Sequence, residues 1–190
     1  MKAIVLCAGF GTRLGPLVAQ RPKPLLAVGD RTIVEHILHN LQAHGFSTVW
    51  INLHHMADQF PKLLGDGSRY GLDLRYLHER EPLGTAGTPR RLLAELSEGT
   101  EVDEDETVLV HYGDVLTDHD VGALLRTHRE NSAEATIVVH ERKGSNSYVF
   151  INERGRVERF IERPETPPDL HGQPQRAFSG LCLLSTRVLR

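Results

Sequence analysis

The stretch KAIVLCAGFGTRL, residues 2–14, decides the fold of this chain. Its first part, residues 2–6, is an apolar run that suits a buried strand. The run leads directly into a turn that contains Gly9 and Gly11. Small residues let the backbone come close to a ligand, and the N–H groups of such a turn can point at an anion. The stretch therefore predicts an α/β fold with a phosphate-binding turn after its first strand.

Two positive charges accompany this turn. Arg13 ends it, and Lys23 follows ten residues later between Pro22 and Pro24. The prolines restrict the backbone around the lysine, because each fixes its own φ angle. Guanidinium and ammonium groups are the side chains that bind phosphate oxygens in proteins. We therefore expect both cations to face the phosphates of a nucleotide.

Apolar runs and helical patterns alternate along the rest of the chain. The sequence predicts strands at residues 2–6, 48–53, 72–77, 107–111, 135–140 and 177–184, and helices at 32–44, 55–64, 85–96 and 118–128. This order predicts a Rossmann-like three-layer α/β/α sandwich with a mainly parallel sheet. Strands at 148–151 and 156–161 flank a turn at 152–155, which predicts an added antiparallel hairpin. An acidic loop is expected at 101–106.

The carboxyl edge of the predicted sheet is the expected place for a ligand. The glycine turn follows the first strand, and Asp114 follows the strand at residues 107–111. Both features therefore fall at the same edge. A carboxylate there suits a hard cation such as Mg²⁺.

Composition limits the other function classes. The chain has 190 residues, 39% of them hydrophobic and 25% charged, with a formal net charge of −3. These values predict a single globular domain over residues 1–190 and give no sign of nucleic-acid binding. No apolar stretch approaches the roughly 18 residues of a membrane span, and the N-terminus lacks the pattern of a signal peptide. Cys7 and Cys182 form no CxxC pair, which favours reduced thiols in a cytoplasmic protein.

A dinucleotide-binding turn is a weaker alternative, because Gly9, Gly11 and Gly15 imitate its glycine spacing. That fold uses an acidic residue at the end of the second strand to bind a ribose. Here the end of the second strand reads Asn52, Leu53 and His54, with no acidic residue. An ordinary glycine turn without a ligand is the other alternative.

The motifs resemble those of a known family. Residues 6–17 and 22–25 closely resemble the opening of the sugar-1-phosphate nucleotidyltransferases. Four later segments resemble further landmarks of that family in the same order: a nucleotide-base segment at 83–87, a metal-binding aspartate within 112–114, a Glu-Lys-Pro segment at 160–164, and a sugar-contacting strand at 178–181. Together these segments cover nearly the whole chain.

The resemblance implies a reaction between two anions. An oxygen of a sugar 1-phosphate attacks the α-phosphorus of a nucleoside triphosphate, and pyrophosphate leaves. Arg13, Lys23 and Asp114 are the implied catalytic residues. Arg13 would stabilise the charge that develops on the α-phosphate, Lys23 would hold a phosphate, and Asp114 would bind Mg²⁺.

The resemblance also implies the binding residues. Those for the nucleotide are Leu6, Ala8, Gly9, Gly11, Thr12, Arg13, Thr85, Ala86 and Gly87, and those for the sugar phosphate are Glu162, Arg163, Gly180 and Ser147. Simpler structural explanations stay open for several of them. Asp114 could cap a helix, Ala86 and Gly87 could simply begin one, and Glu162 could be an exposed charge at a strand end.

The sequence departs from the family's pattern in three places. Arg163 stands where the family usually has lysine, and Ser147 stands near an expected glycine. The family also supplies a second metal-binding aspartate from a strand beyond residue 190, so we expect a chain truncated at its C-terminus. The residues at 163 and 147 could signal an unusual acceptor or a site that has lost activity. The missing second aspartate leads us to expect weak nucleotide binding and poor turnover.

Residues 84–87 and 29–33 look most like those of mannose-1-phosphate guanylyltransferases, which favours GTP and a mannose-type hexose 1-phosphate as substrates. A glucose-1-phosphate-type enzyme that uses UTP or dTTP, and a cytidylyltransferase, are the catalytic alternatives. A non-catalytic regulatory domain that binds nucleotide sugars is another. A further alternative is a subunit whose site is completed by a partner chain. Members of the family often assemble, so a homo-oligomer is also possible.

Overall fold

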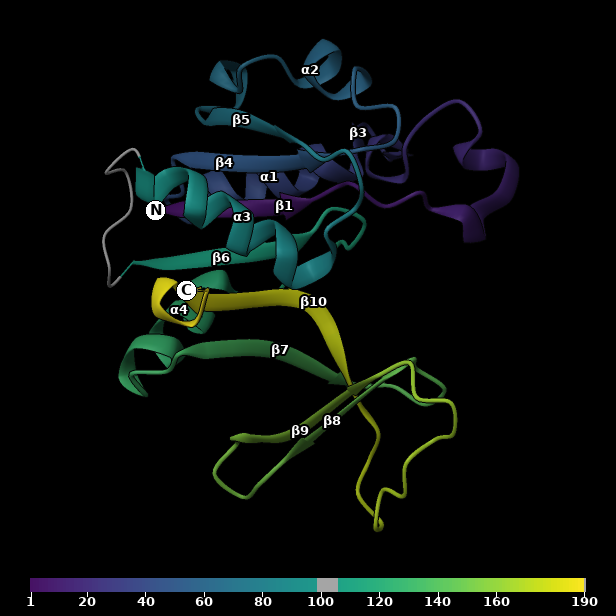
Figure 1. Cartoon of the computed structure of the whole chain (residues 1–190), viewed down its shortest axis with the longest axis vertical. Helices are drawn as coiled ribbons and strands as arrows, with labels where there is room; N and C mark the ends of the chain where they lie inside the picture. Colours follow the sequence, from purple (N-terminus) through teal and green to yellow (C-terminus); the bar gives the residue numbers. More distant parts are fainter. Residues whose placement is uncertain (99–105, 190) are drawn as a thin grey trace. The chain divides into compact units, whose positions relative to one another are not determined.

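A computed structural model describes residues 1–98 and 106–189 (Figure 1). The chain forms two compact units. The first unit comprises Met1–Thr136 and Cys182–Arg190, and the second comprises Ile137–Leu181. Most of the expected acidic loop, residues 101–105, lies outside the described residues.

The main sheet has six strands in the order β5-β4-β1-β6-β10-β7. Their bounds are β1 Lys2–Leu6, β4 Thr48–Leu53, β5 Asp73–His78, β6 Thr107–Tyr112, β7 Ala135–Glu141 and β10 Arg176–Ser185. Strand β1 pairs in parallel with β4 on one side and with β6 on the other, and β4 pairs in parallel with β5. The predicted α/β architecture with a mainly parallel sheet is confirmed.

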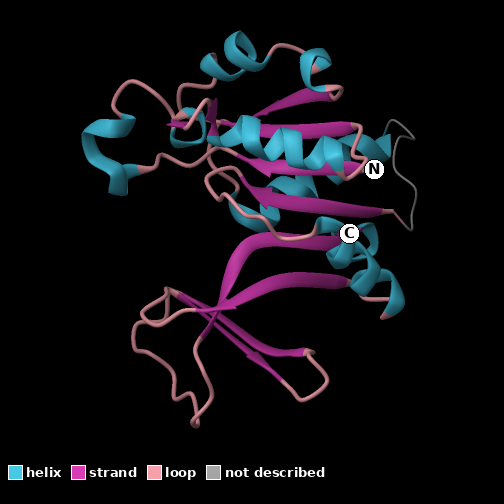
Figure 2. Cartoon of the chain, turned by 180° about the vertical axis from the view of Figure 1, so that it is seen from behind, coloured by secondary structure: helices cyan, strands magenta, loops and turns pink. Residues whose placement is uncertain are grey.

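Helices cover both faces of the strands in the first unit. Helix α1 (Ile33–Ala43) lies on one face and α3 (Gly84–Glu98) on the other, as the two opposite views show (Figures 1 and 2). Helix α1 buries five apolar residues, namely Ile33, Val34, Ile37, Leu38 and Leu41. Thr32 and Glu35 form a capping box at its N-terminus, so the helix begins where the sequence predicted.

Two helices begin later than predicted. Helix α2 covers only Gln59–Leu64, because Pro61 fits the first turn of a helix but not its interior. Helix α4 covers Val121–Glu130. The carboxylate of Asp120 accepts the backbone N–H of Ala123 at 3.0 Å and fixes this start. The cap of α4 is therefore Asp120 and not Asp114.

Short elements complete the first unit. They are the 3₁₀ turns η1 (Thr12–Val18), η2 (Lys23–Leu25), η3 (Ser68–Tyr70) and η4 (Thr186–Leu189), and the small hairpin of β2 (Ala27–Val28) with β3 (Arg31–Thr32). None of the helices in the described part of the chain is long and apolar enough to cross a bilayer.

The second unit contains the predicted hairpin. Strands β8 (Ser147–Ile151) and β9 (Val157–Glu162) pair antiparallel. Gly155 adopts a left-handed φ of 73° in the turn between them, which glycine adopts without strain. Most side chains of β9 are exposed, so this hairpin has a solvated face.

Buried histidines make the stability of the first unit depend on pH. His111 and His128 are each 4% exposed, and burial lowers the pKa of both imidazoles. A lowered pKa means that the unfolded chain binds more protons near neutral pH than the folded chain. Stability is therefore fully present above the unfolded pKa of about 6.5 and is lost as the pH falls below it.

We expect the free energy of unfolding to fall between pH 7.5 and pH 5.5, because the pKa of both histidines is lower in the folded chain than in the unfolded chain. Urea titrations at the two pH values would measure this loss. The His128→Gln variant should show a smaller loss, whereas His171→Gln, which changes an exposed histidine, should behave like the parent. Equal pH slopes for the parent and His128→Gln would contradict this account.

Candidate functional site

The turn after β1 packs directly against the segment that carries Lys23. Gly11 has a left-handed φ of 65°, which strains residues other than glycine. A β-carbon placed on Gly11 would lie 3.2 Å from the β-carbon of Lys23, a tight contact. Both the backbone conformation and the close approach of Lys23 therefore require glycine at position 11.

Lys23 and Asp114 meet beside this turn. The ammonium Nζ of Lys23 lies 2.7 Å from Oδ2 of Asp114. Pro24 and Leu25, the next two residues of η2, are buried and anchor the lysine. The two side chains are 28% and 36% exposed, so the pair is open to solvent and to ligands. The structure thus brings together two residues that are 91 positions apart in the sequence.

Gly113 brings Asp114 close to the turn. The N–H of Gly113 donates to the carbonyl of Leu6 at 2.9 Å, which extends the pairing of β6 with β1 by one residue. A β-carbon on Gly113 would lie only 2.8 Å from that carbonyl oxygen and would also collide with Sγ of Cys7. A larger residue at position 113 would therefore push β6 and Asp114 away from β1.

The other residues predicted for the phosphate turn lie at the end of β1 and in the segment that follows it. Leu6 ends β1, Ala8 is buried, and Gly9 and Thr12 are exposed. The side chain of Arg13 lies outside the described residues, and so does that of Thr85.

The predicted base segment forms the first turn of α3. Gly84 begins the helix with a φ of 73°, and Ala86 is exposed. A β-carbon on Gly87 would lie 2.8 Å from the β-carbon of Leu83, so this turn is tightly wound. The start of α3 belongs to the same compact unit as Lys23 and Asp114.

Three buried polar residues that sequence reasoning missed connect these segments. They are Asn52 at the end of β4, Glu79 just after β5, and Thr88 in α3, exposed by 3%, 4% and 0%. Their side chains are hydrogen-bonded to one another. A signal was available, because Asn52 is a polar residue inside the otherwise apolar end of a strand.

The residues predicted to contact the sugar phosphate lie in the second unit. Ser147 is opposite Glu162 in the β8–β9 ladder, and its hydroxyl accepts the N–H of Phe178 at 3.1 Å. Arg163 follows with a left-handed φ of 49°, and its N–H donates to the carbonyl of Asn146 at 2.6 Å. Ser147, Glu162 and Arg163 therefore gather at one end of the hairpin.

The fourth of these residues, Gly180, is buried within β10 and has a left-handed φ of 79°. Such a conformation interrupts a regular strand and favours glycine. Gly180 therefore has a structural reason to be glycine, whatever it contacts.

Neither cysteine is available as a nucleophile. Cys7 lies one residue past β1, Cys182 lies in β10, and both are free and buried. Burial raises the pKa of the Cys7 thiol far above its usual value and that of Cys182 to about 12. Both thiols are therefore neutral near pH 7, and the thiolate is the reactive form.

A magnesium ion at this site would be held by Asp114 together with the phosphates of the substrate. In the described part of the chain, no three acidic, histidine or cysteine side chains gather as a metal cluster. Mg²⁺ commonly binds one or two carboxylates together with substrate phosphates and water. A partly exposed carboxylate that already attracts the cationic Lys23 fits this mode.

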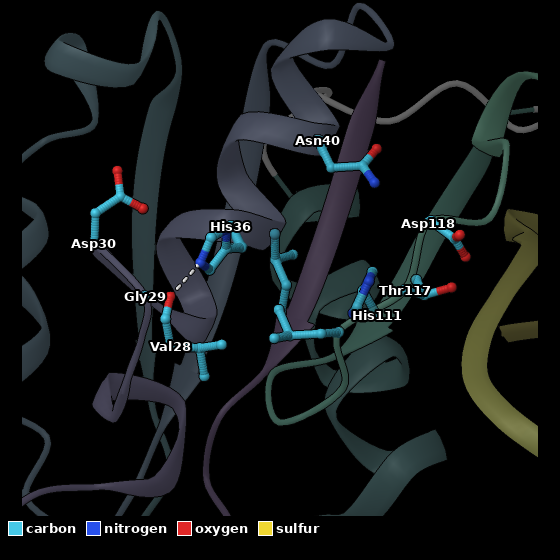
Figure 3. A pocket seen from close by; sticks show the side chains of 10 residues that line it. Val28, Gly29, Asp30, His36, Asn40, His111, Thr117 and Asp118 are labelled. Carbon is cyan, nitrogen blue, oxygen red and sulfur yellow. Dashed lines mark hydrogen bonds between the residues drawn. The ribbon is translucent and has the colours of Figure 1, made fainter.

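A separate hollow of about 610 Å³ lies beside α1 (Figure 3). His36 of α1 contributes to its wall and is hydrogen-bonded through Nε2 to the carbonyl of Val28 at 2.8 Å. The other lining residues are Gly29, Asp30, Ile37, Asn40, His111, Leu116, Thr117 and Asp118. None of the residues predicted to bind nucleotide or sugar phosphate is among them.

Comparisons with known proteins agree with the motifs. Residues 2–190 match the family described as nucleotidyl transferase. The mannose-1-phosphate guanyltransferase beta-B of Xenopus laevis is 34% identical over the whole chain, which covers 51% of that relative. The mannose-1-phosphate guanylyltransferase of Mycobacterium tuberculosis is 34% identical over 87% of the chain and 45% of the relative. The chain thus spans about half the length of the curated relatives that it matches.

A solved structure from Bacillus anthracis, described as a glucose-1-phosphate thymidylyltransferase, shares the fold. Its TM-score is 0.78 at 23% identity, and the match covers all of this chain and 73% of that one. HddC from Yersinia pseudotuberculosis matches with a TM-score of 0.76 at 19% identity, over 99% of this chain and 78% of its own. The glycine turn, the strand order and the family match agree, and the chain belongs to the nucleotidyl transferase family, close to the mannose-1-phosphate guanylyltransferases.

Proposed function

We propose that this protein transfers a nucleotidyl group from a nucleoside triphosphate to a sugar 1-phosphate and releases pyrophosphate. The observation that carries the proposal is the 2.7 Å pair of Lys23 with Asp114 beside the Gly11 turn. In this proposal Lys23 binds a phosphate and Asp114 binds the metal, next to a turn whose conformation suits phosphate binding. Relatives named mannose-1-phosphate guanylyltransferase favour GTP and mannose 1-phosphate as the substrates.

In this mechanism an oxygen of the sugar 1-phosphate attacks the α-phosphorus of the triphosphate. The bond between the α-phosphorus and its bridging oxygen to the β-phosphorus breaks, and pyrophosphate carries that oxygen away. Negative charge develops on the α-phosphate and the leaving group, so fixed positive charge supplies most of the catalysis. Arg13 would stabilise this charge, Lys23 would hold a phosphate, and N–H groups of residues 8–12 would orient the triphosphate.

Asp114 would hold Mg²⁺, which supplies charge neutralisation on the phosphate oxygens when it is bound. The ammonium of Lys23 now neutralises the Asp114 carboxylate, so we expect the lysine to exchange that partner for a phosphate oxygen. In the same proposal, Thr85, Ala86 and Gly87 at the start of α3 contact the base.

The sugar phosphate is proposed to contact Glu162, Arg163, Ser147 and Gly180 of the second unit. This assignment rests on the resemblance of the motifs. The positive φ of Arg163 supports it, because strained residues cluster at functional sites. The hydroxyl of Ser147 is already used by the N–H of Phe178, which favours a structural contribution from this serine.

The test of the function is pyrophosphate release from GTP, UTP, dTTP and CTP, each mixed with mannose 1-phosphate or glucose 1-phosphate and Mg²⁺. We expect turnover with at least one pair and the best turnover with GTP. Turnover with UTP and glucose 1-phosphate instead would support the other substrate class, which is favoured by a 30% identical UTP–glucose-1-phosphate uridylyltransferase from Synechocystis. Binding of nucleotide without any turnover would support the regulatory alternative.

Replacing Lys23 with methionine should lower kcat/KM by about 10- to 100-fold, because one charge-assisted hydrogen bond to a phosphate is lost. Lys62→Met is the matched control. Lys62 lies on α2 and forms a 2.6 Å ion pair with Asp58, in which both side chains are exposed. The control should keep the parental kinetics. Equal kinetics for the two variants would remove Lys23 from the site.

A further inference from the structure

We infer that Asn52 is a positioning residue. It fixes the position of the phosphate loop, defined here as residues 7–13, relative to the start of α3. The inference rests on the proposed function, in which these two segments hold the triphosphate and the base. It adds a buried connection between them that touches neither ligand in the proposed mechanism.

The carboxamide of Asn52 is bonded on both sides. Its Oδ1 accepts the backbone N–H of Cys7 at 2.6 Å, and its Nδ2 donates to Oε1 of Glu79 at 3.1 Å and to Oγ1 of Thr88 at 3.0 Å. An N–H group can only donate, so the bond to Cys7 fixes which way the amide faces. A rotation of the amide would lose these bonds together.

Glu79 completes the connection to α3. Its Oε1 accepts the hydroxyl of Thr88 at 2.5 Å, and its Oε2 accepts the N–H of Leu83 at 3.1 Å. The backbone N–H of Glu79 donates to the carbonyl of Leu53 at 2.8 Å, which ties this residue to the end of β4. A carboxylate that is 4% exposed requires such donors, because burial of an unbonded charge is costly.

The network joins segments that are far apart in sequence. Asn52 is 45 residues from Cys7 and 36 residues from Thr88. A buried network in which every member is hydrogen-bonded is stiff. A change at Thr88 should therefore alter the hydrogen bond and the position of Cys7. Misplacing a reacting group by about 1 Å can cost on the order of 10²-fold in rate. The network is therefore placed to control catalysis through geometry.

The first test removes one hydroxyl from the network. Thr88→Val should lower kcat/KM for the nucleoside triphosphate by about tenfold, through a higher KM or a lower kcat. The KM for the sugar 1-phosphate should change by less than about twofold. Thr136→Val is the matched control, because Thr136 forms a 2.8 Å hydrogen bond with His128 elsewhere in the first unit. If both variants lose thermal stability and neither changes its kinetics, the network only stabilises the fold and the inference is wrong.

The second test exchanges the amide of Asn52 with the carboxylate of Glu79. Asn52→Asp keeps an acceptor for the N–H of Cys7 but places a second carboxylate against Glu79, so kcat/KM should fall by about 10²-fold. The double variant Asn52→Asp/Glu79→Gln restores a donor between the two side chains and should regain about tenfold or more of that loss. A double variant no more active than the single one would overturn the assignment.

A third readout needs no substrate. Amide hydrogen exchange at Cys7 and Leu83 should be about tenfold faster in Thr88→Val than in the parent, while amides of α4 keep their rates. Unchanged exchange at Cys7 would show that the two segments are not coupled. If the parent protein turns over no substrate pair, the proposed function fails, and the exchange rates still decide whether the coupling exists.

Discussion

Replacing Asp114 with asparagine is expected to lower kcat/KM by on the order of 10³-fold, the largest effect of any single substitution in the site. The asparagine keeps the size of the side chain but removes the charge that would hold Mg²⁺. It also removes the negative charge that now lies 2.7 Å from the ammonium of Lys23. A steady-state titration of Mg²⁺ would separate metal binding from chemistry, because weakened metal binding should shift the midpoint to a higher Mg²⁺ concentration.

The matched control for this substitution is Asp58→Asn. Asp58 also pairs with a lysine, Lys62, at 2.6 Å, but both side chains are exposed, at the N-terminus and on the surface of α2 in the same unit. The control should keep the parental rate and the parental midpoint for Mg²⁺. An Asp114→Asn enzyme with the midpoint and rate of the control would show that Asp114 does not hold the metal.

The second large effect is expected from Arg13→Ala, which should lower kcat by about 10²- to 10³-fold if the guanidinium stabilises charge in the transition state. The loss should appear in kcat as well as in kcat/KM, because the interaction of Arg13 with the phosphates strengthens as charge develops in the transition state. Arg13→Lys should recover part of the rate, since it keeps the charge without the planar fork. Rates within about twofold of the parent would remove Arg13 from the mechanism.

The control for Arg13 is Arg31→Ala. Arg31 lies on β3, its side chain is 46% exposed, and its Nε lies 3.8 Å from Oδ2 of Asp30. The Arg31→Ala substitution thus removes a guanidinium from the same unit without changing a residue of the phosphate loop. A loss of rate in this control comparable to that of Arg13→Ala would indicate a general effect of charge.

The architecture could be predicted because its signals are local. The apolar run before Gly9 and the alternation of strands with helices require no knowledge of distant contacts. Parallel pairing then places the ends of β1 and β6 together, which brings Asp114 to the edge that carries the glycine turn. The pairing of Lys23 with Asp114 depends in addition on the packing of η2 beside that turn. The position of α4 was predicted less well, because Asp118 and Asp120 are both plausible caps and only Asp120 receives the N–H of Ala123.

The buried network could not be predicted, since it depends on contacts between separate segments. In the sequence, Asn52 argues only against a dinucleotide site, and no motif there points to Glu79 or Thr88. Hydrogen bonds across 27 and 36 residues make them a single unit with Thr88. The positive φ of Arg163 is likewise invisible in sequence, because arginine has no preference for that conformation.

The central claim is that the turn after β1, Lys23 and Asp114 form one site for a triphosphate and its metal. Calorimetric titration of GTP into the protein, with and without Mg²⁺, tests it most directly. We predict saturable binding that requires Mg²⁺ and is weakened by about tenfold or more in both Lys23→Met and Asp114→Asn, but not in Lys62→Met. Affinity that is unchanged in all three variants, or the absence of binding for GTP and every other nucleoside triphosphate, would contradict the claim.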